Sequence, residues 1–289
     1  MTSGQPIHPK NPLQATDESA HADARAVTDR QRLLDVASEA ADAAAAIIRE
    51  RARDAASISW HLKSHSDFVS EVDTAAEHAI RDVIRTRLPD AEVIGEELSP
   101  ETVARGVTFV VDPLDGTTNF LHRFPVYAVS IAVSVEGTTE AAVILDVPRS
   151  DRYTATRGGG AKRNGEPIRV SPINDASKAL IGTGFPFKHL VYVESYQRQF
   201  AAVVRTTSGI RRAGAAALDL AAVANGWFEA FWELSLAPWD VAAGILLVRE
   251  AGGVVTDLEG VDVDGLTPTG LVAGSRAMHE WLLKTIQSA

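Results

Sequence analysis

The chain has 289 residues, 45% of them hydrophobic and 23% charged, which is typical of a globular protein with a substantial core. Its net charge of -10 argues against a nucleic-acid-binding surface, and no apolar run reaches the ~20 residues that a membrane-spanning helix needs. Cysteine is absent, which excludes disulfides, thiolate metal sites and cysteine nucleophiles; since the N-terminus also lacks a secretory signal, we expect a cytoplasmic protein.

The N-terminal region divides into two parts of different character. Residues 1–27 are rich in Pro, Ser, Asp, His and Ala without a sustained apolar period, which predicts a disordered tail. Thr28 and Gln31 then have the spacing of a capping box, and apolar side chains follow at helical spacing. We therefore predict an amphipathic helix that runs from Thr28 to about Ala52.

A second helix and a β-rich middle section follow. The second helix is predicted to start at Ser70 and to end at Leu88-Pro89, because proline cannot continue a helix. Strand-like runs cover residues 107–111, 126–135, 139–147, 153–156 and 167–170, with a hairpin signal at Asn164-Gly165. Beyond residue 179, short strands alternate with helices predicted over residues 192–204, 215–224, 240–251 and 275–286.

This order of elements predicts two α/β lobes within residues 28–289. We place the seam between them at roughly residues 147–177. No linker-like composition marks the seam, so we expect the lobes to share an extensive interface.

The segment Asp112-Pro113-Leu114-Asp115-Gly116-Thr117-Thr118 is the most informative one for function. It follows an apolar strand, and two carboxylates three residues apart on a tight turn can converge on one hard cation. Gly116 lets the backbone approach a ligand closely, and Thr117 can present a hydroxyl and an N–H group to a phosphate or an attacking water. Asp, Pro and Gly are also the residues that ordinary turns prefer, but a turn alone does not require all seven residues.

Two other segments carry carboxylates suited to the same chemistry. Glu96 and Glu97 follow Gly95 at the end of a short strand, where one can face a metal while the other faces solvent. Paired glutamates also occur in ordinary solvated loops. Asp240 precedes an apolar helix, and it is interpreted either as the N-cap of that helix or as a third-segment ligand of a cation cluster.

Taken together, three motifs in this order resemble the inositol monophosphatase family: Gly95-Glu96-Glu97, Asp112–Phe120 and Pro238–Gly244. The resemblance covers roughly Asp29 to Ile286. Its further supports are Lys63, Asp73, His122–Pro125, Gly214–Asp219 and Glu250–Gly253. One departure is Ala215, because the family usually has Ser or Thr there and a possible hydroxyl contact is missing.

The resemblance implies a layered αβαβα sandwich, related to the fructose bisphosphatases, that forms a phosphatase domain over residues 28–289. It implies Mg-dependent hydrolysis of a phosphate monoester by in-line attack of a metal-activated water, with inhibition by lithium. Relatives that cleave nucleotide bisphosphates or histidinol phosphate tend to place Lys or Arg after Asp-Gly-Thr. This chain has Thr118-Asn119-Phe120 there, which favours inositol 1-phosphate.

The same resemblance implies a cation site built from oxygen ligands. The first Mg2+ would bind Glu96, Asp112 and the carbonyl of Leu114. The second would bind Asp112, Asp115 and Asp240. A weaker third ion would contact Glu96, with Asp73 nearby, and Mn2+ could substitute for Mg2+.

Catalytic and substrate-binding roles are implied as well. Thr117, assisted by Glu96 and with Asp73 nearby, would activate the attacking water. The N–H groups of Gly116 and Thr117 would bind phosphate oxygens. The other substrate contacts implied by the family are Leu114, Asp115, Gly214, Ala215, Ala216, Glu233 and Asp240.

The alternatives concern the substrate, the class of phosphatase and a role without catalysis. A sugar bisphosphate, histidinol phosphate or a nucleotide 3′-phosphate is an alternative substrate. The Asp-x-Asp-Gly-Thr motif of haloacid-dehalogenase-like phosphatases does not fit, because two residues separate Asp112 from Asp115. A regulatory or scaffold protein on the same fold is the alternative of another class. The partners that we expect are a small phosphorylated polyol and a second copy of the chain, but neither nucleic acid nor a membrane.

Overall fold

The structure is a computed structural model that describes residues 12–54, 58–64, 67–99 and 104–289. Its α-helices are α1 (Pro12–Ala52), α2 (Glu71–Arg87), α3 (Thr117–Leu121), α4 (Val193–Val204), α5 (Ala216–Ala224), α6 (Pro238–Glu250) and α7 (Arg276–Gln287). Two short 3₁₀ helices are η2 (Ala176–Lys178) and η3 (Leu190–Tyr192).

The strands form one hairpin and two sheets. The hairpin consists of β1 (Trp60–Ser64) and β2 (Asp67–Ser70). The first sheet consists of β3 (Glu92–Gly95), β4 (Val107–Asp115), β5 (Ala128–Val135), β6 (Thr138–Asp146), β7 (Asp151–Thr156), β8 (Gly160–Arg163) and β9 (Glu166–Pro167). The second sheet consists of β10 (Leu180–Thr183), β11 (Gly209–Arg211), β12 (Ala230–Leu236), β13 (Val254–Thr256) and β14 (Thr269–Gly274).

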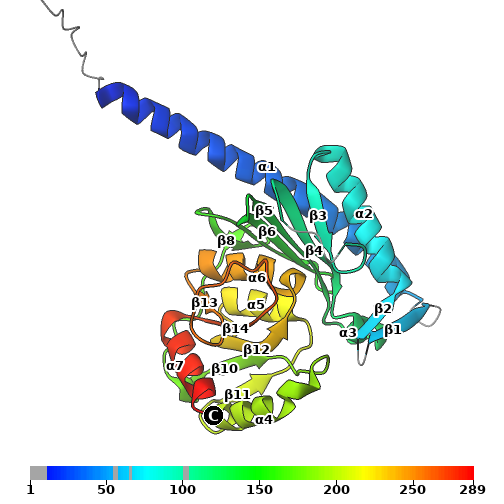
Figure 1. Cartoon of the computed structure of the whole chain (residues 1–289), viewed down its shortest axis with the longest axis vertical. Helices are drawn as coiled ribbons and strands as arrows, with labels where there is room; N and C mark the ends of the chain where they lie inside the picture. The colour runs from blue at the N-terminus through cyan, green and yellow to red at the C-terminus, as the bar shows by residue number, and fades with distance from the viewer. Residues whose placement is uncertain (1–11, 55–57, 65–66, 100–103) are drawn as a thin grey trace, which may run out of the picture.

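Helices and sheets alternate in five layers (Figure 1). Helices α1 and α2 cover the outer face of the first sheet, α5 and α6 lie between the two sheets, and α4 and α7 cover the outer face of the second sheet. Each sheet can bury both faces in this arrangement, which explains why its strands carry continuous apolar runs. The predicted αβαβα sandwich is therefore confirmed.

Both sheets are mixed. In the first sheet, which has the order β3-β4-β5-β6-β7-β8-β9, β3 and β4 are parallel and all later neighbours are antiparallel. In the second sheet, which has the order β11-β10-β12-β14-β13, β10 is parallel to both neighbours and the other pairs are antiparallel. The predicted hairpin at Asn164-Gly165 joins β8 to β9, and both residues have the positive φ angles that a two-residue turn requires.

Three apolar clusters hold the layers together. One joins α1 and α2 to the first sheet, and another joins α4 and α7 to the second sheet. The third surrounds α5 and α6 and includes residues from both sheets. Because the third cluster includes residues of both sheets, it joins the two halves of the chain.

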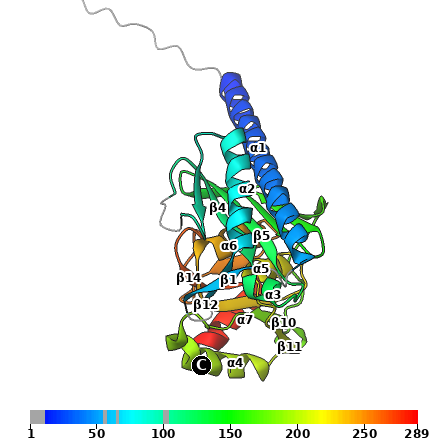
Figure 2. The same ribbon diagram turned by 90° about the vertical axis from the view of Figure 1, so that its right-hand side faces the viewer.

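Helix α1 is longer than predicted. It begins at Pro12, not at Thr28, so residues 12–27 are helical and the prediction of a disordered tail is wrong for them. Five of these sixteen residues are Ala, the strongest helix former, and Pro12 occupies the first helical position, where proline is tolerated. It lacks an apolar period because it projects beyond the sheet that the rest of α1 covers (Figures 1 and 2). The remainder of the predicted tail, residues 1–11, lies outside the described part of the chain.

Helix α2 has the predicted ends. Ser70 is the N-cap, and its side chain forms a reciprocal capping box with Asp73. Leu88, directly before Pro89, is the C-cap, and its N–H group bonds to the carbonyl of Ile84. The buried face of α2 includes two acidic side chains, Asp73 and Glu77, which is unusual in an otherwise apolar interface.

Strand β4 continues into the segment that the sequence analysis placed in a turn. Its pairing with β5 is regular up to Asp112, shifts in register between Asp112 and Asp115, and then resumes. Gly116 follows with a φ of 91°, after which α3 begins at once. The irregular end of a central strand thus presents the two aspartates, and the rigid sheet fixes their backbone.

The chain passes from the first sheet to the second between Pro167 and Leu180. The predicted seam covered residues 147–177, but strands β7, β8 and β9 within it still belong to the first sheet. The passage between the sheets therefore begins later than predicted. Among the described helices, none combines the length and the apolar character needed to cross a membrane.

Candidate active site

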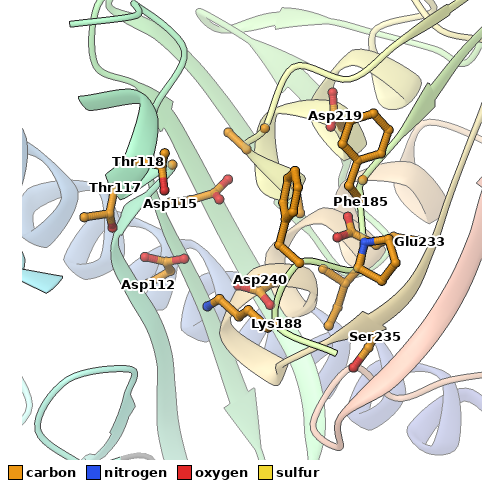
Figure 3. Close-up of a pocket in the computed structure, with 18 of the residues that line it drawn as sticks. Asp112, Asp115, Thr117, Thr118, Phe185, Lys188, Asp219, Glu233, Ser235 and Asp240 are labelled. Atoms are coloured by element: carbon orange, nitrogen blue, oxygen red, sulfur yellow. The ribbon is translucent and has the colours of Figure 1, made fainter. Parts of the chain in front are cut away.

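A cavity of about 340 Å3 opens where the irregular end of β4 meets the start of α5, strand β12 and the start of α6 (Figure 3). Its acidic lining residues are Glu96, Asp112, Asp115, Asp219, Glu233 and Asp240. Its basic ones are Lys188 and Arg212, and His189 also lines it. The cavity therefore collects side chains from segments that are far apart in the chain, which only the tertiary fold brings together.

Asp112 and Asp115 are held by backbone N–H groups. The Oδ1 atom of Asp112 accepts a hydrogen bond from the N–H of Leu114 at 2.9 Å. The Oδ2 atom of Asp115 accepts one from the N–H of Ala217 at 2.8 Å. Both residues are less than one tenth exposed and line the cavity, so backbone N–H groups fix the position of each carboxylate at the cavity wall.

Asp115 also explains how α5 tolerates Ala215. Ala215 is the N-cap of α5 and offers no side-chain hydrogen bond to the first turn of the helix. The carboxylate of Asp115 bonds to the first-turn N–H of Ala217 instead. A side chain from β4 thus satisfies a first-turn N–H group of α5 that the N-cap residue leaves without a side-chain acceptor.

Thr117 lies between the cavity and a buried carboxylate. Its hydroxyl donates to Oδ1 of Asp73 at 2.7 Å, and it also lies 3.1 Å from the carbonyl oxygen of Leu114. Asp73 does not line the cavity; its other oxygen accepts hydrogen bonds from the N–H and hydroxyl of Ser70. Because its proton is directed to Asp73, Thr117 is left with lone pairs that can accept a hydrogen bond from a ligand.

Asp240 lies at the start of α6 but is not its N-cap. Ala237 is the N-cap, and Asp240 is the third residue of the helix, with Oδ2 accepting a hydrogen bond from the N–H of Ala237 at 2.7 Å. Of the two interpretations of Asp240 given above, the one that makes it the N-cap of this helix is therefore wrong. Asp240 shares the cavity with Asp112 and Asp115 from the opposite wall (Figure 3).

The carboxylates raise one another's pKa. Burial, followed by the charges of Glu96, Asp115 and Asp240, raises the pKa of Asp112 well above its usual range. Burial and the charge of Asp240 raise the pKa of Asp115 to about 7. Repulsion of this kind is the expected result when buried acidic groups face one another.

The donor set fits a hard divalent cation. Carboxylate and carbonyl oxygens are the ligands that Mg2+ and Mn2+ prefer, and no sulfur is present in the chain's cavity lining. Within the described residues, no three acidic or histidine side chains are already drawn together tightly enough to enclose an ion.

Glu233 lies on β12 and is packed against Gly184. A Cβ atom at position 184 would lie 2.0 Å from the Glu233 carboxylate, so only glycine leaves room for it. Burial and the charge of Asp240 raise the pKa of Glu233 to about 8, although Arg212 and Lys188 oppose this shift. The structure thus places Glu233 in the same cavity as the aspartates (Figure 3).

Lys188, Arg212 and Asp219 line the cavity but were not singled out as site residues from the sequence. The guanidinium of Arg212 lies 5.1 Å from the ring centre of Phe185 and 5.0 Å from that of Phe187. Nothing in the local pattern distinguishes these two cations from ordinary surface residues. Asp219 belongs to the Gly214–Asp219 motif shared with the family, and its burial in the structure distinguishes it from surface carboxylates.

The remaining predicted residues also reach this region. Leu114, Gly116, Gly214, Ala215 and Ala216 all line the cavity. Lys63 lies in β1, and its side chain is outside the described part of the structure.

Asn119 ties the glycine turn before α5 to α3. Its amide nitrogen donates to the carbonyl oxygens of Val126 at 2.8 Å and of Ala213 at 3.0 Å. Gly214, beside Ala213, has a φ of 89°, and a Cβ atom there would lie 2.6 Å from a guanidinium nitrogen of Arg212. These contacts hold the start of α5 against the loop that follows Asp115.

The five-layer αβαβα fold, with its carboxylate-lined cavity at the irregular end of β4, is the fold of solved inositol monophosphatases. Comparison with known proteins gives the family: residues 29–289 match the model of the inositol monophosphatase family. The chain belongs to the inositol monophosphatase family.

Several relatives are similar over nearly the whole chain. Nus factor SuhB of Pseudomonas aeruginosa is 44% identical, over 89% of this chain and 96% of that protein. The crystal structure of extragenic suppressor protein SuhB from Bartonella henselae has a TM-score of 0.82 at 37% identity, covering 89% of this chain and 99% of that one. The inositol monophosphatase of Anabaena has a TM-score of 0.77 at 32% identity, covering 91% and 97%.

Proposed function

We propose that this chain is a Mg-dependent phosphatase that hydrolyses inositol 1-phosphate to inositol and phosphate. The observation that carries the proposal is the convergence of Glu96, Asp112, Asp115 and Asp240 on one cavity, next to the hydrogen-bonded pair of Thr117 and Asp73. Membership of the inositol monophosphatase family supports phosphatase chemistry in general. The substrate is inferred from the residues that surround the cavity.

The cavity walls divide into a cation side and a substrate side. Glu96, Asp112 and the Leu114 carbonyl would hold one Mg2+, and Asp115 and Asp240 would join Asp112 at a second. When bound, these ions supply positive charge that offsets the charge of the phosphate group. A dianionic substrate could not enter so acidic a cavity without that compensation.

Thr117 is proposed to hold the attacking water. Because the Thr117 hydroxyl donates its proton to Asp73, its oxygen accepts a hydrogen bond from the water and so directs a water lone pair toward phosphorus. Glu96, on the same cation side of the cavity, would accept the second water proton. Asp73 thereby acts through Thr117 and needs no contact with substrate.

The polyol is proposed to lie toward β12. The Glu233 carboxylate would accept hydrogen bonds from ring hydroxyls, in the space that Gly184 keeps open. The N–H groups of Gly116 and Thr117 would donate to the phosphate oxygens. A carboxylate acceptor can bind the several hydroxyl donors of inositol. It is less suited to the flat apolar surface of a nucleotide base.

Phosphate release from four compounds tests the proposal. Inositol 1-phosphate, fructose 1,6-bisphosphate, histidinol phosphate and adenosine 3′,5′-bisphosphate are each assayed with Mg2+ and with a chelator. We expect chelator-sensitive release that is fastest with inositol 1-phosphate. Faster release from another compound would reject the substrate and keep the cation-dependent mechanism, whereas no release from any of them would reject the phosphatase function.

A second candidate function is favoured by the names of the relatives. Proteins that are 44% identical to this chain over most of its length are named Nus factor SuhB. A Nus-factor role would correspond to the regulatory alternative, and it would qualify our expectation that nucleic acid is not a partner. Expression of the wild type and of a variant without turnover, in cells that lack their own SuhB, separates the two functions. Rescue of the cells by both proteins would favour a role independent of catalysis.

A further inference from the structure

Helix α2 carries three charged side chains at successive intervals of four residues: Asp73, Glu77 and Arg81. Side chains at this spacing lie on one face of a helix. Asp73 contacts Thr117, as described above, at one side of the cavity. Glu77, one turn further along α2, contacts the segment that carries Glu96. One face of α2 therefore reaches two parts of the proposed cation site.

Glu77 is fully buried and its carboxylate is saturated with donors. Oε2 accepts hydrogen bonds from the N–H of Glu97 at 2.8 Å and from the N–H of Leu98 at 3.3 Å. Oε1 accepts from two nitrogens of Arg81, at 2.9 and 2.8 Å. A buried charge with these partners is tolerated. Loss of the carboxylate would remove the acceptor of Arg81 and of two backbone N–H groups.

Gly95 fits against the same carboxylate. A Cβ atom at position 95 would lie 2.1 Å from Oε1 of Glu77, so any side chain there would displace it. Glu77 therefore contacts the backbone on both sides of Glu96, packing against Gly95 and bonding to the N–H of Glu97. The residue between these two contacts is the one whose side chain lines the cavity.

Ser99 closes the turn from its other end. Its hydroxyl donates to the carbonyl oxygen of Val93 at 2.7 Å and lies 3.3 Å from the N–H of Gly95. Arg81 donates to the same hydroxyl while it pairs with Glu77. Residues 95–99 are thus attached to α2 through two linked side chains and to β3 through a third.

We propose that Glu77 is a positioning residue for cation binding: it holds the 95–99 turn so that Glu96 faces the cavity. Glu77 does not itself line the cavity. The inference rests on the proposed function, because it takes Glu96 to be a cation ligand. A purely structural role for Glu77 would change the stability of the fold, whereas a positioning role changes the affinity for the cation in a protein that is still folded.

Calorimetric titration with Mg2+ tests this role in the full-length protein. The variant is Glu77→Ala, and the matched control is Glu229→Ala. Glu229 is likewise a buried glutamate that accepts a backbone N–H, from Leu180, and a side-chain donor, Ser171, but these contacts lie in the second sheet away from the cavity. Residues that orient ligands typically change metal affinity 10- to 100-fold, so we expect roughly that loss for Glu77→Ala and none for Glu229→Ala.

Hydrogen exchange at two amides provides an independent readout. We expect the N–H groups of Glu97 and Leu98 to exchange faster in Glu77→Ala, while the N–H of Ala217, which bonds to Asp115, stays protected. If Glu77→Ala does not fold, Glu77→Gln replaces it. Gln keeps an acceptor for Glu97 but loses the charge that pairs with Arg81, so we expect a smaller loss of Mg2+ affinity.

The outcomes separate the inference from the function on which it rests. A folded Glu77 variant that binds Mg2+ as tightly as the wild type would overturn the positioning role and leave the proposed function intact. Equal losses in the Glu77 and Glu229 variants would also overturn it, since they indicate a general effect of instability. A wild-type protein that shows no Mg2+ binding would reject the proposed function itself.

Discussion

At the scale of single residues, Asp112 is a buried carboxylate whose charge is strongly disfavoured by its surroundings. It is buried, it faces three other carboxylates, and its pKa is raised well above its usual range. The proposed cation site would explain why a residue so unfavourable to the fold occupies this position. Stability and function oppose each other at such a residue, which is common at sites that bind charged ligands.

Asp112→Asn is expected to remove Mg-dependent turnover and to leave the protein folded. The substitution keeps the shape and the acceptor for the Leu114 N–H while it removes one of four repelling charges. We expect at least a ~100-fold loss of activity. In chelator we expect a melting temperature higher by roughly 2 °C, as for a gain of about 1 kcal/mol. Near-normal activity of the variant would contradict the cation site.

Thr117→Val tests the proposed contact with the attacking water. Valine keeps the shape of threonine and lacks the hydroxyl that donates to Asp73. We expect kcat to fall about 100-fold while Mg2+ affinity stays unchanged, because Thr117 is not a proposed ligand. Thr117→Ser, which retains the hydroxyl, serves as the control and should keep most of the activity. Equal activity of the valine and serine variants would exclude the role.

At the scale of secondary-structure elements, the junction between β4 and α3 decides the geometry of the site. The strand ends irregularly, Gly116 adopts a left-handed conformation, and α3 starts at the next residue. A Cβ atom at Gly116 would also lie 2.8 Å from the carbonyl oxygen of Val126. Glycine is required here by both the backbone conformation and the space available.

Gly116→Ala is expected to destabilise the protein more than Gly137→Ala does. Both glycines have positive φ angles, 91° and 79°, but a Cβ atom at Gly137 would meet nothing within 4 Å. The Gly137 variant therefore measures the backbone term alone, about 1 kcal/mol, and we expect a total of about 2–3 kcal/mol for Gly116. Unfolding in urea measures both, and equal values would show that the contact with Val126 relaxes freely.

The contact between α7 and the second sheet contains a buried histidine. His279 lies within hydrogen-bond distance of the Thr256 hydroxyl, 2.9 Å away, and burial lowers its pKa below the usual value of 6.5. The folded state therefore binds its proton less readily than the unfolded state. Its contribution to stability is complete above pH 6.5 and is lost progressively as the pH falls below that value.

We expect the free energy of unfolding to decrease between pH 7.5 and pH 5.5 by an amount that includes His279. His279→Gln keeps a polar group near Thr256 and cannot titrate, so the decrease should be smaller in the variant, by on the order of 1 kcal/mol. Denaturant unfolding at the two pH values measures the difference. An identical decrease in the wild type and the variant would show that His279 titrates normally.

At the scale of the whole molecule, an exposed apolar segment lies near the cavity. The 3₁₀ helix η3 presents Leu190, Val191 and Tyr192, which are 59%, 83% and 41% exposed. An adjoining apolar hollow of about 350 Å3 shares its Phe185–Phe187 wall with the site cavity. Contiguous apolar surface of this kind typically marks an interface, which agrees with our expectation of a homodimer.

Val191→Asp is expected to shift the protein from dimer to monomer if η3 contributes to that interface. A buried, unpaired carboxylate would strongly disfavour association. Light scattering measures the mass, and Val261→Asp is the matched control because Val261 is 61% exposed on a different loop. A wild-type protein of monomeric mass would contradict the expected homodimer, and a dimeric Val191 variant would place the interface elsewhere.

The sequence by itself determined the local features of this protein. The start of α2 at Ser70 and the hairpin at Asn164-Gly165 were predicted correctly, because helix ends and turns depend on residues close to one another in the chain. The layered fold class was predicted from the resemblance of short motifs to those of a family. The carboxylates Asp112, Asp115 and Asp240 were identified for the same reason, since each belongs to a short motif. The helical character of residues 12–27 was missed because no apolar stripe marked it.

Only the tertiary structure decided which of these groups meet. Thr117 and Asp73 are 44 residues apart, and Glu77 lies 20 residues from the N–H of Glu97 that it binds. Lys188 and Arg212 have no local pattern that separates them from surface cations, yet both line the cavity. Contacts of this kind arise when separate layers pack, and their partners are fixed by the register of the sheets rather than by the neighbouring residues.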